Sequence, residues 1–210
     1  MTIGFVVGMQ AEAALLRPLD GAVAISGATV QGAREAVLRL IRDGASRLVS
    51  FGLAGGLDPA VRAGDVLVPS RVVVDGRDYF PDLALCARLG GMTPGGLLHS
   101  DIVVATAAEK NALHVASLCT ALDMESGVVA QAAQAARLPF AVLRAICDPA
   151  GRDLPPAAMA ALKPDGRLAF PTILVSLLRG PVQIPGMLAL ARDAAAARRA
   201  LTARIPLIRP

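Results

Sequence analysis

The stretch at residues 123–148, DMESGVVAQAAQAARLPFAVLRAICD, constrains the fold of this chain more than any other. Residues 126–137 are rich in Ala, and Pro139 follows them, which predicts a helix that ends before the proline. Residues 140–147 are apolar enough to form a strand. A helix that leads into such a strand is typical of an α/β protein, in which ligands bind beyond the carboxyl ends of the strands. We therefore expect Asp148 to lie at the mouth of a binding site.

The remainder of the chain repeats this alternation of strand and helix. Apolar and β-branched runs predict further strands at residues 2–7, 22–26, 47–51, 97–104 and 118–123. Helical patterns are found at residues 9–16, 30–43, 83–89 and 105–118. The run at 66–74 predicts a long or bent strand and a hairpin edge, and residues 75–81 predict a loop. The glycine-rich segment at 52–57 predicts either a tight turn or a close approach of the backbone to a ligand. These units predict one α/β sheet covered by helices.

The composition agrees with helices laid against a parallel sheet. The chain is 54% hydrophobic but only 3% aromatic, and it has no Trp, so the core must consist of Ala, Val and Leu. The chain has few aromatic side chains on which nucleic-acid bases could stack, so we expect no nucleic-acid partner. Cys86, Cys119 and Cys147 lack the spacing of a zinc site, which predicts no metal and reduced thiols in a cytoplasmic protein.

No linker rich in Pro, Gly and Ser separates two complete sets of elements, so we expect one compact unit. Residues 1–166 form its α/β domain, and residues 167–210 a helical extension packed on that domain. The extension combines apolar helices, predicted at 171–178 and 186–201, with about seven Arg for one Asp. Such a segment either makes peripheral contact with an anionic membrane, or covers the sheet or a dimer interface.

Polar residues cluster after the predicted strands, as in a site built from several loops of one sheet; these are Glu12, Ser26, Gly55, Asp101, Glu125 and Asp148. Two carboxylates and an Arg suit acid-assisted cleavage: one acid protonates a leaving group, one carboxylate orients a hydroxyl or water, and the Arg stabilises charge. Taken singly, Glu125 and Asp148 also fit a helix N-terminal carboxylate and a loop cap, and Glu12 fits a surface position.

The order and spacing of several elements resemble the nucleoside phosphorylase and nucleosidase family. The elements are residues 3–16 with Glu12, the turn at 52–57 followed by Gly64-Asp65-Val66, the DMES sequence at 123–126, and residues 138–148. Within that family the chain is most similar to the hopanoid-associated phosphorylases, through DMES, the RDLPPAA sequence at 152–158 and a short apolar extension. The resemblance implies a three-layer αβα sandwich with a central mixed, mostly parallel twisted sheet.

The resemblance also implies a role for each site residue. Asp148 is expected to be the general acid that protonates or hydrogen-bonds N7 of a purine, and Glu12 to activate the attacking water. Glu125 is expected to accept hydrogen bonds from the ribose hydroxyls, Met124 to pack under the sugar, and Arg144 to orient Asp148 or the sugar side. The remaining substrate-binding residues that it implies are Ser26 and Gly27, Ala54 and Gly55, Asp101 near the purine, and Val103 on a base-facing strand.

The implied reaction is cleavage of the N-glycosidic bond of a 5'-substituted adenosine, and the closest resemblance implies adenosylhopane in hopanoid biosynthesis. The products are then adenine and ribosylhopane or its phosphate. Leu53 replaces a hydroxyl that nucleosidases usually offer, and Val103 replaces a common aromatic residue, so the pocket is more apolar than theirs. Two alternatives stay open: a methylthioadenosine or adenosylhomocysteine nucleosidase, and a noncatalytic relative that binds a nucleoside or lipid.

We expect no cofactor, and inorganic phosphate is the alternative to water as co-substrate. Arg34, Arg47 and Arg71 are candidates for binding phosphate only because they are arginines, since no motif marks them. The partners expected are the small-molecule substrate, a second copy of the chain in a homodimer or larger homo-oligomer, and a membrane surface touched by the extension.

Overall fold

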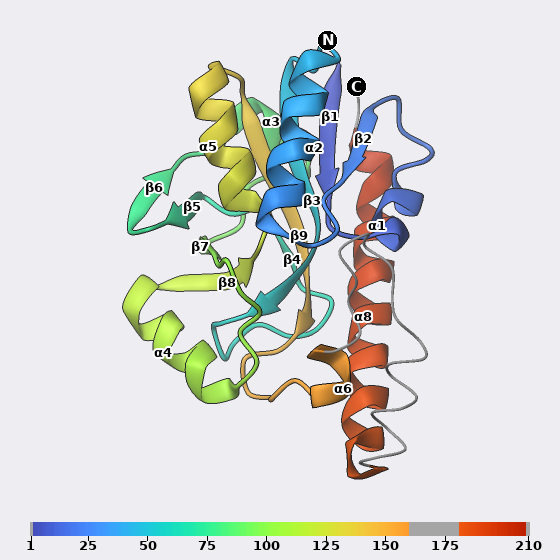
Figure 1. Ribbon diagram of the computed structural model, residues 1–210, viewed down its shortest axis with the longest axis vertical. Helices are drawn as coiled ribbons and strands as arrows, with labels where there is room; N and C mark the ends of the chain where they lie inside the picture. The colour runs from blue at the N-terminus through green and yellow to red at the C-terminus, as the bar shows by residue number, and fades with distance from the viewer. Residues whose placement is uncertain (1, 160–180, 209–210) are drawn as a thin grey trace.

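The computed structural model describes residues 2–159 and 181–208, in which strands and helices alternate as expected (Figure 1). In chain order the elements are β1 Ile3–Val7, α1 Gln10–Leu15, β2 Ala22–Ile25, α2 Val30–Arg42, β3 Arg47–Gly56, β4 Val66–Leu67, β5 Arg71–Val74, β6 Arg77–Tyr79, α3 Leu83–Arg88, β7 Gly96–His99, α4 Ala107–Ser117, β8 Cys119–Asp123, α5 Ser126–Ala136, β9 Phe140–Asp148, α6 Pro156–Met159 and α8 Ile184–Arg204. The helix predicted at residues 171–178 lies outside the described residues, as does the boundary between the two predicted parts of the chain, which stays a prediction.

The strands of the described residues form one nine-stranded sheet. Its main path runs β2-β1-β3-β8-β7-β5-β6, and β9 pairs with β3 and β4. The β1-β2, β1-β3, β3-β9, β5-β7 and β7-β8 pairs are parallel, whereas β3-β8, β4-β9 and β5-β6 are antiparallel. The prediction of a mixed, mostly parallel sheet is therefore confirmed. The long parallel pairing of β3 with β9 places Gly52 beside Arg144 and Gly55 beside Asp148.

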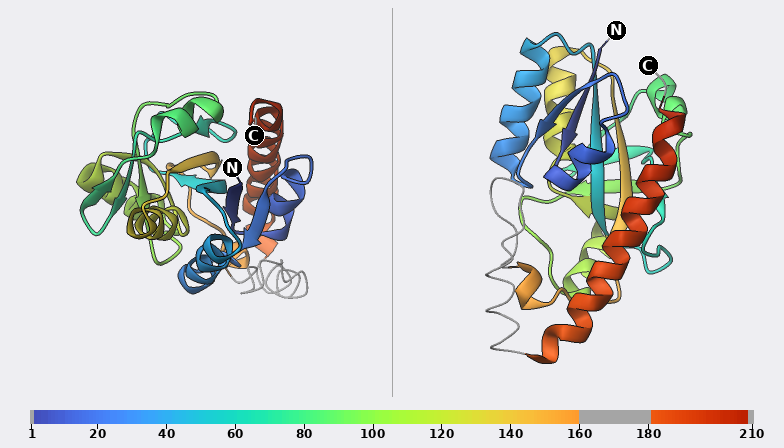
Figure 2. Two further views of the ribbon diagram at one scale, coloured as in Figure 1. Left: turned by 90° about the horizontal axis from the view of Figure 1, so that it is seen from above. Right: turned by 90° about the vertical axis from the view of Figure 1, so that its right-hand side faces the viewer.

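Helices cover both faces of this sheet, which confirms the predicted three-layer αβα sandwich (Figure 2). On one face, α2 and α5 pack through small and branched side chains such as Val37 and Ala133. On the other face, α1, α3 and α8 pack against the strands, with Leu85 and Leu201 buried. The scarcity of aromatic residues allows these Ala- and Val-rich layers to approach closely.

The C-terminal helix α8 belongs to the core of the protein. Its residues Ala197 and Leu201 are buried, as are Ile205 and Ile208 just beyond it, and the helix runs along β9 (Figure 2). The extension was predicted either to contact a membrane or to cover the sheet or a dimer interface. Helix α8 covers the sheet. Among the described residues, no helix is long and apolar enough to cross a membrane.

The glycine-rich segment at 52–57 does not form a tight turn, which is one of its two predicted uses, because β3 continues through Gly56. Its glycines allow close packing within a strand instead. Gly52 has a φ of +153°, and a Cβ there would lie 2.5 Å from Glu12 Oε1 and 2.6 Å from Arg144 Nη1. Because glycine has no side chain, the charged side chains of Glu12 and Arg144 can pack directly against the backbone of β3 at this position.

Two further predictions are wrong in their extents. The run at 66–74 divides into β4 and β5, and the predicted loop after it contains β6. The predicted hairpin is present, because β5 and β6 pair antiparallel and are joined through Asp75 and Gly76 at positive φ. The strand predicted at 97–104 ends at His99. Beyond it, Ser100 turns the chain by bonding to the backbone N–H and carbonyl of Ile102, so Val103 lies on a loop and not on a base-facing strand.

Candidate active site

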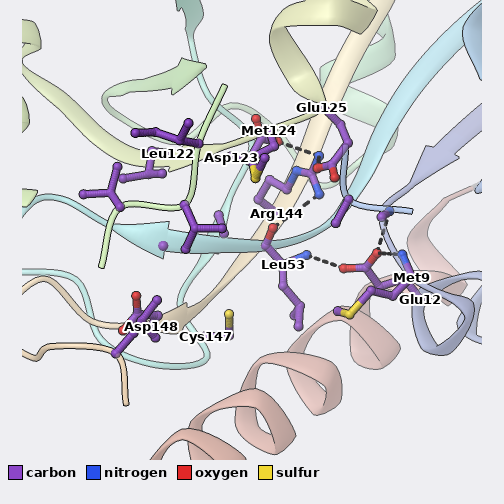
Figure 3. A pocket seen from close by; sticks show the side chains of 18 of the residues that line it. Met9, Glu12, Leu53, Leu122, Asp123, Met124, Glu125, Arg144, Cys147 and Asp148 are labelled. Carbon is purple, nitrogen blue, oxygen red and sulfur yellow. Dashed lines mark hydrogen bonds and ion pairs between the residues drawn. The ribbon is translucent and has the colours of Figure 1, made fainter. Parts of the chain in front are cut away.

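The ends of β1, β3, β8 and β9 converge on a cavity of ≈ 230 Å³ (Figure 3). Most of the predicted site residues line it: Glu12, Ala54, Gly55, Val103, Met124, Glu125, Arg144 and Asp148. Ser26 and Gly27 line a neighbouring cleft, although Ser26 Oγ lies 3.4 Å from Glu125 Oε1 and donates a hydrogen bond to it. Asp101 is not part of the cavity lining; its side chain is 78% exposed and pairs with His99.

Glu12 is held inside the protein by the start of its own helix. Its Oε2 accepts hydrogen bonds from the N–H groups of Gly8 and Met9, both at 2.8 Å, and its Oε1 accepts one from Leu53 N–H at 2.8 Å. The residue is only 2% exposed, which excludes the surface position left open above. Burial raises the pKa of this carboxyl, and the Arg144 charge and the three N–H groups offset part of that rise. Glu12 is consequently a stronger base than an exposed Glu.

Arg144, on β9, joins the acidic residues that follow β8. Its Nη2 lies 2.5 Å from Asp123 Oδ2 and 2.9 Å from Glu125 Oε2, and it donates to Ser50 Oγ at 2.7 Å. Its Nη1 donates to the Leu53 carbonyl at 3.3 Å. Arg144 was expected to orient either Asp148 or the sugar side of the site. In the structure it points toward Glu125 and not toward Asp148.

Burial raises the pKa of Glu125 to about 7, with Asp123 and Glu12 adding to the rise and Arg144 opposing it.

Asp148, at the end of β9, has a different partner, Lys110 of α4. Lys110 Nζ lies 2.6 Å from Asp148 Oδ2, and Lys110 is 0% exposed. Asp148 Oδ1 is buried and has no hydrogen-bond partner among the described residues. Burial raises the pKa of Asp148, whereas the hydrogen bond and the charge of Lys110 lower it.

Lys110 is, together with Asp123, a site residue that sequence reasoning missed. It is a single Lys in an Ala-rich helix, where the ordinary expectation is a solvated side chain. One signal was available: Leu113 follows it by three residues, which places the two on the same face of α4, and Leu113 packs on a small core cluster. That spacing alone does not reveal an ion-pair partner.

The cavity therefore has two polar ends separated by apolar side chains (Figure 3). Glu12, Glu125 and Arg144 lie at one end, Asp148 lies at the other, and Leu53 and Cys147 are among the residues between them. Among the described residues no cluster of His, Cys, Asp and Glu is arranged to hold a metal. The arrangement suits a ligand with hydroxyls at one end and a proton-accepting group at the other.

The raised pKa of Glu125 predicts how stability depends on pH. A carboxyl that binds its proton more tightly in the folded than in the unfolded protein favours folding most at low pH, and loses that contribution as pH rises from about 4.5 to about 7. We expect Glu125→Gln to reduce this fall in the free energy of unfolding by about 1–3 kcal/mol, measured by urea unfolding at pH 5 and pH 8.

Glu109→Gln is the control for that measurement. Glu109 is exposed, and a hydrogen bond from the Thr106 hydroxyl lowers its pKa, so its removal should leave the fall with rising pH in place. An unchanged pH dependence in Glu125→Gln contradicts the raised pKa of that carboxyl.

Comparison with known proteins agrees with this fold. Residues 92–163 match the family model of the phosphorylase superfamily. No curated protein matches the chain. Among solved structures, S-adenosylhomocysteine nucleosidase from Streptococcus pyogenes, in complex with 5-methylthiotubericidin, is 20% identical over 100% of this chain and 98% of that chain, with a TM-score of 0.70.

Two other solved structures are similar. A 5'-methylthioadenosine/S-adenosylhomocysteine nucleosidase from Colwellia psychrerythraea 34H, in complex with adenine, is 22% identical over 85% of this chain and 95% of that chain, with a TM-score of 0.67. Futalosine hydrolase of Helicobacter pylori is 16% identical over 98% and 97% of the two chains, with a TM-score of 0.69. The chain thus has the fold of the nucleosidases, and the predicted resemblance to the nucleoside phosphorylase and nucleosidase family is confirmed.

Proposed function

We propose that this protein cleaves the N-glycosidic bond of a 5'-substituted adenosine and releases adenine. The observation that carries the proposal is the pair of polar ends in one cavity. The carboxylates of Glu12 and Glu125 are held at one end, and Asp148 lies at the other, with its buried Oδ1 unpartnered among the described residues. The nucleosidase fold supports the same reaction.

Each polar end has a chemical task in this reaction. Asp148 donates a proton from Oδ1 to N7 of adenine while the C1'–N9 bond breaks and its electron pair moves into the purine, because adenine leaves poorly as an anion. Glu125 accepts hydrogen bonds from the ribose hydroxyls, and Arg144 fixes its orientation. Glu12 accepts a proton from the attacking water, for which its burial makes it more basic.

The charges of the lining favour water over phosphate as the attacking group. Four carboxyl groups, Glu12, Asp123, Glu125 and Asp148, line the cavity. The two cationic side chains in the described lining, Arg144 and Lys110, each already pair with a carboxyl group. A phosphate dianion entering this site finds no cation in the described lining that is not already paired, whereas a neutral water molecule needs none.

For the 5' substituent we propose a large apolar group, and adenosylhopane as the substrate. The apolar side chains that line the cavity support this, among them Leu53, Val103 and Leu190 of α8. From the resemblance we expect a hydroxyl group at the position of Leu53 and an aromatic residue at that of Val103. The DMES sequence at 123–126 and the RDLPPAA sequence at 152–158, on which the expected resemblance to the hopanoid-associated phosphorylases rests, support the proposal as well. Exposed Val182, Ile184 and Leu188 near the start of α8 support contact with the membrane that would supply such a lipid.

One incubation tests these points together. The protein is given methylthioadenosine in solution, or adenosylhopane in anionic vesicles, each with and without phosphate, and adenine and the sugar product are identified. We expect adenine release from both that does not depend on phosphate, with a free sugar as product and a higher kcat/KM for the lipid.

The other outcomes separate the alternatives. A sugar 1-phosphate formed only with phosphate contradicts water as the attacking group. Turnover of methylthioadenosine alone contradicts the lipid substrate and leaves a methylthioadenosine-type nucleosidase. No release of adenine from either compound contradicts the reaction and favours a noncatalytic binding protein.

A further inference from the structure

The buried ion pair between Lys110 and Asp148 is not explained by the fold. Lys110 is 0% exposed, and a fully buried ammonium group costs several kcal/mol in desolvation unless partners surround it. Its partners are Asp148 Oδ2 at 2.6 Å, the Arg152 carbonyl at 2.9 Å and the Pro149 carbonyl at 3.3 Å. Replacing such a pair by apolar residues is often neutral or stabilising, so stability alone is a weak reason for a buried pair at a cavity.

The geometry of the pair divides the two oxygens of Asp148 between two tasks. Oδ2 faces the ammonium group, and Oδ1 is buried without a hydrogen-bond partner in the described part of the chain. Both side chains line the cavity. Oδ1 is therefore the oxygen of Asp148 that is available to a ligand. The ion pair between Lys110 and Oδ2 fixes the orientation of the carboxyl group, and so the direction in which Oδ1 points.

We propose that Lys110 is a positioning residue that stabilises the Asp148 carboxylate formed when Asp148 protonates the leaving base; this rests on the proposed function. In that step the O–H bond at Oδ1 breaks, the N7–H bond forms, and the electron pair of the C1'–N9 bond moves into the purine. Asp148 thereby gains a full negative charge, 2.6 Å from the ammonium group of Lys110. Stabilisation of charge that develops during the reaction accelerates it. The proton that Glu12 takes from the attacking water returns to Asp148 through solvent.

This role has a consequence that a structural role lacks. A leaving group that needs no proton, such as 4-nitrophenolate, gains nothing from an acid at Asp148, so its departure should not depend on Lys110. Adenine release should depend on Lys110 strongly. The ratio of the two rates therefore isolates the effect of the ammonium group from any general damage to the site.

Lys110 contacts the loop after β9 through the carbonyls of Pro149 and Arg152. Other hydrogen bonds also hold this loop in place, so we expect it to keep its position when Lys110 is replaced. Ala107 N–H donates to Asp153 Oδ1 at 2.7 Å, and Leu154 N–H donates to the Ala105 carbonyl at 2.8 Å. Asp153→Asn weakens one of these anchors without removing the ammonium group. It is the matched control for loosening of the loop.

The experiment compares Lys110→Met with the unaltered protein on methylthioadenosine and on the 4-nitrophenyl glycoside of 5-methylthioribose. We expect kcat/KM for adenine release to fall by about 10²-fold, and that for 4-nitrophenolate release by less than about threefold. Loss of the cation also raises the pKa of Asp148, so the limb of the pH profile at which this acid loses its proton should move to higher pH. Asp153→Asn should lower the rates on both substrates alike or on neither.

Lys110→Gln, which keeps a hydrogen-bond donor but no charge, should show the same selective loss if Lys110→Met folds poorly. Equal losses on the two substrates, or no loss of adenine release, overturn the role of Lys110 alone. Failure of the unaltered protein to release adenine overturns the proposed function together with this inference.

Discussion

Asp148→Asn is expected to lower kcat for adenine release by about 10²- to 10⁴-fold, the usual range for removal of a general acid. The amide has nearly the same shape as the carboxyl group and still reaches Lys110, but it cannot supply the proton that adenine needs as it leaves. Substrate binding, measured by calorimetry with a nonhydrolysable adenosine analogue, should weaken far less than kcat falls. The expected change is therefore confined to the bond-breaking step.

Asp101→Asn is the matched control for this variant. Asp101 was predicted to lie near the purine, but its side chain is largely exposed and outside the cavity lining. We expect its kinetics to equal those of the unaltered protein. Full activity in Asp148→Asn contradicts the assignment of the acid, and equal losses in the two variants contradict the geometry of the site.

Arg144→Met is expected to destabilise the protein by about 3–5 kcal/mol, because it removes one partner of a buried ionic cluster. Asp123, Glu125 and Glu12 are then left buried near one another without the guanidinium group that offsets their charge. The loss is measured as the free energy of unfolding in urea. It should be larger at pH 8 than at pH 5, because unpaired carboxyls with raised pKa values take up protons as the pH falls and become neutral.

Arg71→Met is the control for that measurement. Arg71 makes an ion pair of 3.0 Å with Asp78, but both side chains are about one third exposed. We expect a loss of about 1 kcal/mol or less, as for other surface pairs. A comparable loss in the two variants would show that the burial of the Arg144 cluster does not govern its energetics.

Much of the local structure followed from patterns of neighbouring residues. The helix predicted at residues 126–137 and the strand predicted after it agree with α5 and β9 to within one residue. Both were predictable because helix propensity and the stop imposed by Pro139 act within a few residues of the chain. The spacing of the motifs also led us to expect Glu12 and Glu125 in one site, and the two residues line one cavity.

The two errors have different physical reasons. The glycines of β3 favour a turn in isolation, but Gly52 allows Glu12 and Arg144, which come from other elements, to approach each other across a strand. Val103 was predicted on a strand that ends earlier, at His99. There the hydrogen bonds of Ser100 with Ile102 turn the chain, and a local turn ends the β-branched run.

The sequence by itself determined the alternation of strands and helices, the mostly parallel sheet and the carboxylates at strand ends, since period, propensity and motif spacing are properties of the chain alone. Only the tertiary structure decided how the charges pair. Arg144 lies on the same strand as Asp148 yet faces Glu125, whereas Lys110, on helix α4, pairs with Asp148. Coulomb energy depends on distances in space, and burial sets how strongly each pair acts.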